Sequence, residues 1–249
     1  MQAEVYHLYH SGIAVKLDKQ LFIFDYYNDQ AVSDNDLSSL ERGVLREDSF
    51  FNIEEAFVFV SHDHHDHYNK VIFEWEKYCD NIYYILAEQV SLTKDLKNKD
   101  NLYRIKKDQS LSLSNFKIKA LGSTDKGVSF LVKKEEINIF HAGDLNWWKW
   151  KKFSAKVQKK EEKDYKREVH KLKREKIDIA FVPVDSRLEE NYYLAGQYFI
   201  NKIKPELFVP IHFSNNFAIT EKFSEKMAEE LSNHTKIAQI NSRGEKILY

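Results

Sequence analysis

A dense group of histidines and aspartates directly follows a short apolar segment of this sequence. The segment Ala56-Phe57-Val58-Phe59-Val60 has the length and composition of a buried strand. The group that follows it, Ser61-His62-Asp63-His64-His65-Asp66-His67, holds four of the ten histidines of the chain. Neutral imidazole and carboxylate groups are the usual protein ligands of zinc, manganese, iron and nickel. The sequence therefore predicts a metal site at the end of a buried strand.

The composition and charge of the chain exclude several classes of protein. Its 249 residues are 43% hydrophobic, enough for a sizeable core, and we treat 1–249 as a single domain. The net charge of -1 gives no basic field that would attract nucleic acid or an anionic membrane. The single cysteine, Cys79, excludes an intramolecular disulfide and a cysteine-based zinc finger. Because we see neither a secretory signal nor an apolar run of about 18–20 residues, we expect a cytoplasmic protein that crosses no membrane.

Short apolar runs and turn residues predict a β-rich chain with helices between its strands. We expect strands at Val5–Tyr9, Gly12–Leu17, Gln20–Asp25, 56–60, Ile82–Leu86, Leu102–Ile105, Gln109–Leu113, Phe116–Ala120, Val128–Lys133, Ile137–His141, Ile177–Pro183 and Leu207–Ile211. The chain should close with strands Lys236–Ile240 and Lys246–Tyr249 across a turn at Ser242-Arg243-Gly244. We expect helices at Asp36–Arg42, Tyr68–Tyr78, Ala87–Leu96, Asn191–Ile203 and from a capping Thr220 to about Asn233.

The segment Trp147–Lys176 is strongly charged and carries a thin apolar stripe, which predicts one or two helices. Two interpretations remain open for the charged run 149–176. It is a solvated helix face, or it is a lid or a dimer arm over the site. A dimer arm would make the protein a homo-oligomer.

Four segments in order resemble the motifs of the metallo-β-lactamase superfamily. Asp25 ends an early apolar strand, and His62-x-His64-x-Asp66-His67 follows a later one. The other two motifs are His141-Ala142-Gly143-Asp144 and Pro210-Ile211-His212. Tyr9-His10-Ser11-Gly12 and the run Asp178 to Pro183 are most similar to the branch that includes L-ascorbate-6-phosphate lactonase.

The resemblance implies an αββα four-layer sandwich, in which two mixed β-sheets pack face to face with helices outside. It also implies one or two divalent metal ions, with zinc foremost and manganese or iron as alternatives. The ligands carried over are His62, His64 and Asp144 for a first ion, and Asp66, His67, Asp144 and His212 for a second. Asp25 would orient a ligand histidine through its other ring nitrogen.

The chain departs from the superfamily in one motif, which usually supplies a further histidine to the first metal. The corresponding stretch here is Gly122-Ser123-Thr124-Asp125-Lys126-Gly127 and holds no histidine. Three explanations stay open: Asp125 supplies an oxygen ligand, which would favour manganese or iron; His141 takes the place; or only one metal binds tightly.

Several further residues are candidates for roles in catalysis. Asp66 is expected to act in the reaction as well as to bind metal, and His10 and His141 are general-acid candidates or structural histidines. His65, between ligands, is expected to face away from the site. Arg187 could clamp a substrate phosphate or carboxylate, and Asn215 could donate a hydrogen bond to a developing oxyanion.

Two metal ions about 3.5–4 Å apart can share a hydroxide that attacks a carbonyl carbon or a phosphorus atom. The resemblance thus predicts a metal-dependent hydrolase of a small-molecule ester, lactone or phosphoester. A nuclease-type phosphodiesterase is an alternative, against which the near-neutral charge counts. A non-catalytic metal-binding protein that retained the fold is another.

Overall fold

The computed structural model describes residues 2–32, 36–134, 137–230 and 235–249. These residues form two compact units, each built on its own β-sheet. The first unit comprises Met1–Lys106 and Asn241–Tyr249, and the second comprises Lys107–Ile240. The single domain 1–249 stays a prediction.

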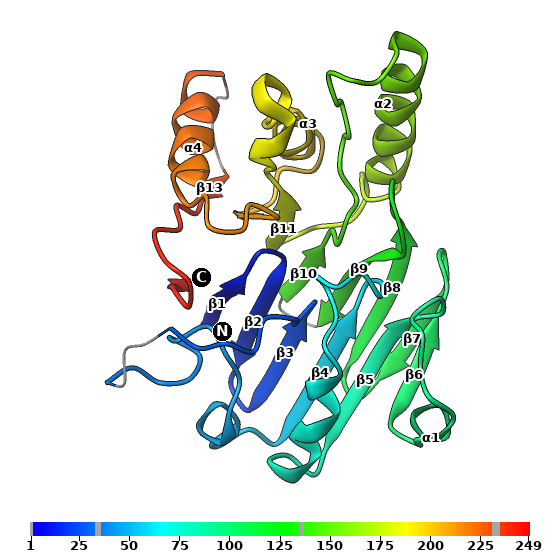
Figure 1. The fold of residues 1–249 in the computed structure, drawn as a ribbon, viewed down its shortest axis with the longest axis vertical. Helices are drawn as coiled ribbons and strands as arrows, with labels where there is room; N and C mark the ends of the chain where they lie inside the picture. The colour runs from blue at the N-terminus through cyan, green and yellow to red at the C-terminus, as the bar shows by residue number, and fades with distance from the viewer. Residues whose placement is uncertain (1, 33–35, 135–136, 231–234) are drawn as a thin grey trace. The chain divides into compact units, whose positions relative to one another are not determined.

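The first unit is built on a mixed seven-stranded sheet in the order β14-β1-β2-β3-β4-β5-β6. Figure 1 labels its strands β1 to β6. Strands β14, β1, β2 and β3 pair antiparallel, and β3 to β6 pair parallel. The strands are β1 Ala3–Tyr9, β2 Gly12–Leu17, β3 Gln20–Phe24, β4 Glu55–Val60, β5 Ile82–Ala87, β6 Leu102–Ile105 and β14 Lys246–Leu248. Its helices are short: η1 Glu47–Phe50, η2 Lys70–Lys77 and α1 Lys94–Lys97. The early strands and the strand before the histidine cluster are confirmed.

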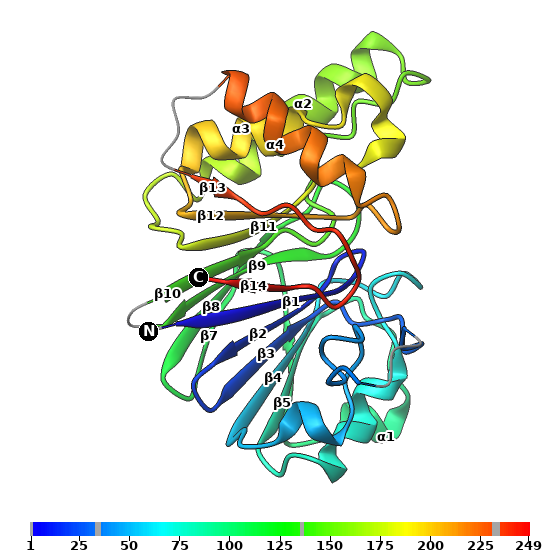
Figure 2. The same ribbon diagram turned by 90° about the vertical axis from the view of Figure 1, so that its left-hand side faces the viewer.

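The second unit is built on another mixed seven-stranded sheet, in the order β13-β12-β11-β10-β9-β8-β7. Strands β7 to β10 pair antiparallel, and β10 to β13 pair parallel. The strands are β7 Ser110–Leu113, β8 Phe116–Gly122, β9 Val128–Lys134, β10 Ile137–His141, β11 Ile179–Pro183, β12 Leu207–Ile211 and β13 Lys236–Ile237. Figure 2 shows its helices α2 Ala155–His170, α3 Leu194–Ile203 and α4 Ala218–Glu230 on one side of this sheet, and η3 spans Ser186–Asn191. Among the residues described, no helix combines the length and apolar character that crossing a membrane requires.

The strand that precedes the histidine cluster is held by aromatic packing in the first sheet. Phe57 and Phe59 on β4 are fully buried and stack on Phe22 and Phe24 of β3, with ring centroids 5.2 and 4.6 Å apart. Burying a phenylalanine side chain contributes about 1.5–3 kcal/mol, so this layer fixes the two strands firmly. Because β3 and β4 are parallel neighbours, their carboxyl ends lie side by side, which brings Asp25 next to the cluster.

Two helices predicted in the first unit are wrong. Asp36–Arg42 forms bends and turns instead of a helix. These turns lead to Gly43, whose positive φ of 72° suits glycine. Within Ala87–Leu96 only the last residues are helical, in α1. The carboxylate of Asp63 accepts hydrogen bonds from the backbone N–H and hydroxyl of Ser91, and these contacts hold the segment in a non-helical conformation. The predicted helix 68–78 is present as the 3₁₀ helix η2.

The chain end also differs from the prediction, because the last two strands do not pair with each other. β13 pairs with β12 in the second sheet, and β14 pairs with β1 in the first. Thr220 is not a cap but the third residue of α4, and its hydroxyl accepts a hydrogen bond from the N–H of Ile240 at 2.9 Å. The residues at 231–234, where the predicted helix would end, lie outside the described chain.

The charged segment forms the single helix α2, which begins after the capping Ser154. Its outer face is exposed, as the solvated-face interpretation predicts. Its inner face is buried and includes Tyr165, whose hydroxyl donates to the carbonyl of Ala195 at 2.8 Å. The preceding residues 147–150 are not helical.

Candidate metal centre

The histidine cluster of the first unit gathers three imidazoles closely. His62 and His67 are fully buried, and their ring centroids are 4.2 Å apart. His62 Nε2 lies 3.0 Å from Nδ1 of His64. The His65 side chain is 96% exposed, so the prediction that it faces away from the cluster is confirmed.

Asp25 orients His67 from the end of the neighbouring strand. The carboxylate is 1% exposed, and its Oδ2 accepts a hydrogen bond from His67 Nδ1 at 2.8 Å. It also accepts from the backbone N–H and the hydroxyl of Ser61, each at 2.7 Å. This is the contact expected of Asp25, since a histidine that ligates metal usually donates its other ring N–H to a carboxylate or carbonyl. The role of His67 as a ligand stays a prediction.

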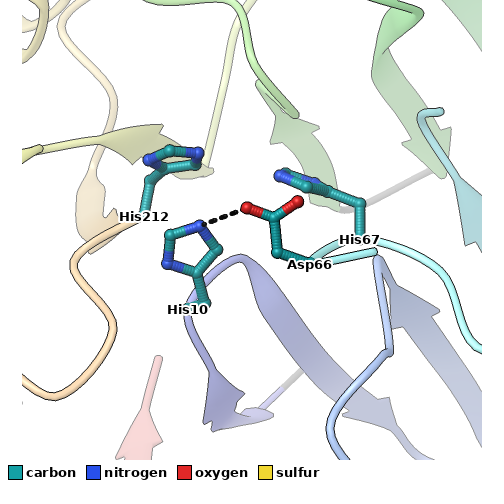
Figure 3. Close-up of side chains that lie close together, drawn as sticks. All are labelled: His10, Asp66, His67 and His212. Carbon is teal, nitrogen blue, oxygen red and sulfur yellow. Dashed lines mark ion pairs between the residues drawn. The ribbon is translucent and has the colours of Figure 1, made fainter. Parts of the chain in front are cut away.

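His10 approaches the cluster from the turn between β1 and β2. Figure 3 shows its ring facing the carboxylate of Asp66, with Nε2 3.6 Å from Oδ2. One ligand atom each from His10, Asp66 and His67 lie within 4.8 Å of one another. Burial opposes ionisation of Asp66, but its contact with His10 and the charge of His67 outweigh burial and hold the pKa of Asp66 well below its usual range. His10 is therefore placed to serve as a ligand as well as in the expected acid role.

The second unit brings together Asp144, which follows β10, and His212, which follows β12. His212 Nε2 lies 3.1 Å from Asp144 Oδ1, and both side chains are buried. His212 Nδ1 lies 3.1 Å from Oδ2 of Asp185, which follows β11. Burial opposes protonation of His212, but the carboxylates of Asp144 and Asp185 outweigh it and raise its pKa.

Sequence reasoning missed the role of Asp185 and gave its neighbour Arg187 a different one. The Arg187 guanidinium binds both oxygens of Asp185, with Nε 2.9 Å from Oδ1 and Nη2 2.6 Å from Oδ2. Its predicted bidentate clamp is thus made to a carboxylate of the protein. Burial opposes ionisation of Asp185, but His212 and Arg187 hold its pKa well below the usual range. The available signal was an aspartate just beyond the end of a buried strand, similar to the signal that singled out Asp25.

The loop that lacks the expected histidine lies beside Asp144. One carboxylate oxygen of Asp125 is within 4.8 Å of one of Asp144. The hydroxyl of Thr124 donates to the carbonyl of Asn146 at 2.6 Å and accepts from the N–H of Asn146 at 2.9 Å. The role of Asp125 as an oxygen ligand, the first of the three explanations, stays a prediction.

The remaining candidates lie in varied surroundings. His141 is fully buried, and its Nδ1 accepts a hydrogen bond from the N–H of Gly143 at 3.1 Å. That contact orders the loop that carries Asp144. Asn215 is exposed. The ring of Trp148 lies edge-on to that of His212, with ring centroids 5.6 Å apart.

The donor set of both units fits a divalent metal. It consists of imidazole nitrogens and carboxylate oxygens, which suit zinc, iron and manganese. Two nitrogens bound to one tetrahedral zinc at about 2.0–2.1 Å would lie about 3.3 Å apart. The His62–His64 separation of 3.0 Å and the His212–Asp144 separation of 3.1 Å are close to that spacing.

Comparisons with known proteins identify the fold. No protein-family model and no curated protein matches the chain. Among solved structures, Igni18, a metallo hydrolase from Ignicoccus hospitalis, is 14% identical with a TM-score of 0.62, covering 100% of this chain and 99% of that one. YhfI from Bacillus subtilis, a metallo-β-lactamase fold protein, is 11% identical with a TM-score of 0.60, covering 100% and 98%. CmlA from Streptomyces venezuelae, a diiron β-hydroxylase, is 9% identical with a TM-score of 0.61, covering 99% and 54%.

These likenesses confirm the predicted fold class, whereas the lactonase branch stays a prediction. Because the same fold serves a hydrolase and a hydroxylase, it does not determine the reaction. With its two mixed seven-stranded sheets and their helices, the chain has the metallo-β-lactamase fold.

Proposed function

We propose that the protein is a metal-dependent hydrolase of a small ester, lactone or phosphoester. The observation that carries the proposal is a repeated pairing of imidazole and carboxylate. His67 in the first unit and His212 in the second each have Nδ1 against a buried aspartate at a strand end, Asp25 and Asp185. Such pairs fix the tautomer and the ring orientation of histidines that bind metal. They therefore favour a metal site over a polar loop that is merely rich in histidine.

The proposed ligands are those that the sequence resemblance assigns: His62, His64, Asp66, His67, Asp144 and His212, with Asp125 in place of the absent histidine. Divalent ions held by these residues would lower the pKa of water and polarise the bond that is cleaved. Zinc is the first expectation. If Asp125 replaces a histidine at the first metal site, its oxygen ligand would favour manganese or iron there.

His10 is proposed as the residue that gives a proton to the leaving group. Its Nε2 lies 3.6 Å from the Asp66 carboxylate, so the ring is at the edge of the histidine cluster. Contact with His10 and the charge of His67 hold the pKa of Asp66 well below its usual range, so the carboxylate that faces the His10 ring is ionised at neutral pH. His141 is less suited to that task because its Nδ1 accepts a hydrogen bond from the N–H of Gly143.

Metal analysis combined with an activity screen tests the proposal. The purified protein should contain a transition metal, lose it to a chelator, and hydrolyse at least one of a set of lactones, thioesters and phosphodiesters. His64→Ala and His212→Ala should lower both metal content and turnover. His65→Ala is the matched control, since that side chain is 96% exposed in the same loop, and it should change neither.

Each result separates the candidate functions. Cleavage of phosphodiesters alone would favour the phosphodiesterase alternative. Metal binding with no turnover on any substrate would favour the non-catalytic binding protein. A wild-type protein that binds no zinc, manganese or iron would overturn the metal site itself.

A further inference from the structure

A buried carboxylate stands on the inner face of the charged helix α2. The Glu168 side chain is 0% exposed, and two lysine amines contact it. Lys107 Nζ lies 2.7 Å from Oε1, and Lys171 Nζ lies 2.8 Å from Oε2. Burial raises the pKa of Glu168, but the hydrogen bonds from the two lysines outweigh burial and lower it. A buried charge is costly unless it is paired, and these two lysines provide the pairing.

Glu168 also holds the backbone at the end of β8. Its Oε2 accepts a hydrogen bond from the N–H of Gly122 at 3.2 Å. A Cβ at position 122 would lie 2.9 Å from Glu168 Cδ and 2.7 Å from Lys107 Nζ, so glycine permits this close approach. Residues 123–125, the loop without the expected histidine, follow directly.

The other side of that loop is attached to the segment that carries Asp144. The Thr124 hydroxyl bonds to the carbonyl and the N–H of Asn146, at 2.6 and 2.9 Å, and lies 3.2 Å from the carbonyl of Asp144. A short series of contacts therefore leads from Glu168 through residues 122 and 124 to the Asp125 and Asp144 carboxylates, which approach within 4.8 Å.

We propose that Glu168 is a positioning residue of the metal centre. By holding Gly122 it sets the place of Asp125 beside Asp144, and so determines how tightly these two carboxylates bind a divalent cation. The charged helix would thus serve as a brace for this loop. The inference rests on the metal-site function proposed above.

Glu168→Gln tests the inference, with Glu175→Gln as the matched control. Glu175 is also a carboxylate with two lysines, since it pairs with Lys133 at 2.8 Å and Lys119 at 3.8 Å, both on strands. Cobalt(II) titration, followed by the visible absorption spectrum, and zinc competition with a chelator give the metal affinity and ligand geometry without any substrate. Residues that orient metal ligands typically change affinity about 10–100-fold when replaced, so we expect a loss of this size and an altered spectrum for Glu168→Gln. Glu175→Gln should keep both unchanged.

A second pair of variants applies if Glu168→Gln does not fold. Thr124→Val removes the hydroxyl that joins the loop to Asn146, whereas Thr124→Ser retains it. The inference expects the valine variant to lose metal affinity and the serine variant to keep it. Wild-type affinity and spectrum in Glu168→Gln, or in Thr124→Val where Glu168→Gln does not fold, would overturn the positioning role while leaving the metal site intact. A wild-type protein without metal would instead overturn the proposed function.

Discussion

Replacing Asp25 with asparagine should weaken metal binding by forcing His67 into the wrong tautomer. Asp25 Oδ1 accepts from the Ser61 N–H, and Oδ2 accepts from the Ser61 hydroxyl and from His67 Nδ1. Asparagine keeps only one acceptor oxygen, and the backbone N–H of Ser61 can only donate. The oxygen must therefore stay on that N–H, and the new NH₂ group faces His67. His67 can avoid two opposed donors only by accepting at Nδ1, which moves its proton to Nε2 and blocks that nitrogen as a ligand.

The size of the effect follows from the contacts that change. Replacing a residue that orients a metal ligand typically costs about 10–100-fold in affinity, which is about 1.4–2.7 kcal/mol. The free energy of unfolding of the metal-free protein should fall by about 1–3 kcal/mol, because hydrogen bonds to a charged group become hydrogen bonds to a neutral one. Backbone strain should not add to this loss. Asp25 has φ 45°, and asparagine tolerates the left-handed region better than alanine does.

The assay measures zinc affinity by competition with a chelator and the His67 tautomer by ¹⁵N NMR of the imidazole. Asp63→Asn is the control: Asp63 lies in the loop that carries His67, and its carboxylate accepts hydrogen bonds from the N–H and hydroxyl of Ser91. It should leave zinc affinity unchanged. The reasoning fails if Asp25→Asn binds zinc as tightly as wild type, or if the proton of His67 stays on Nδ1.

Three more predictions follow from the second unit. Asp185→Asn should lower metal affinity about tenfold or more by the same tautomer argument at His212, measured by the same competition assay; unchanged affinity would show that Asp185 serves only Arg187. The raised pKa of His212 stabilises the metal-free protein fully below about pH 6.5, and that stability is lost as pH rises through the raised value. Burial lowers the pKa of His7 to about 3, so its contribution to stability changes with pH in the opposite direction. The free energy of unfolding in urea should therefore be compared between wild type and His212→Asn at each pH. A difference between the two proteins that does not shrink at high pH would contradict the prediction. Asp125→Ala should reduce metal content from about two ions per chain toward one by elemental analysis, and unchanged content would exclude Asp125 as a ligand.

The strands could be predicted from the sequence because a short apolar run between turn residues is typical of a buried strand. The Ala56–Val60 run is an example, since every residue of it is buried in β4. The pairing of the chain end could not be predicted in this way. β14 finds its partner near the start of the chain, with Leu248 opposite Glu4, and no local turn signal reports such a distant contact.

The ligand candidates could be named from residue type and spacing, but their supporting contacts depended on tertiary structure. Asp185 and Asp63 carry the same side chain, and both lie close in sequence to predicted ligands or clamps. Asp185 contacts His212 because β11 and β12 are neighbours, whereas Asp63 turns toward Ser91. The position of Asp185 after a buried strand was visible in the sequence, but the partner that each aspartate contacts depends on tertiary structure, which the sequence pattern does not contain.

The two units use the same arrangement to orient a histidine, and parallel strand pairing explains why. Asp25 follows β3 and His67 belongs to the loop after β4, which is the parallel neighbour of β3. Asp185 follows β11 and His212 follows β12, again a parallel neighbour. Parallel neighbours end at the same edge of a sheet, so an aspartate after one strand can reach a histidine in the segment that follows the next strand. For His212, which directly follows β12, strand register sets this contact, and a one-residue shift between β11 and β12 would separate Asp185 from His212 even if every candidate ligand remained in the sequence.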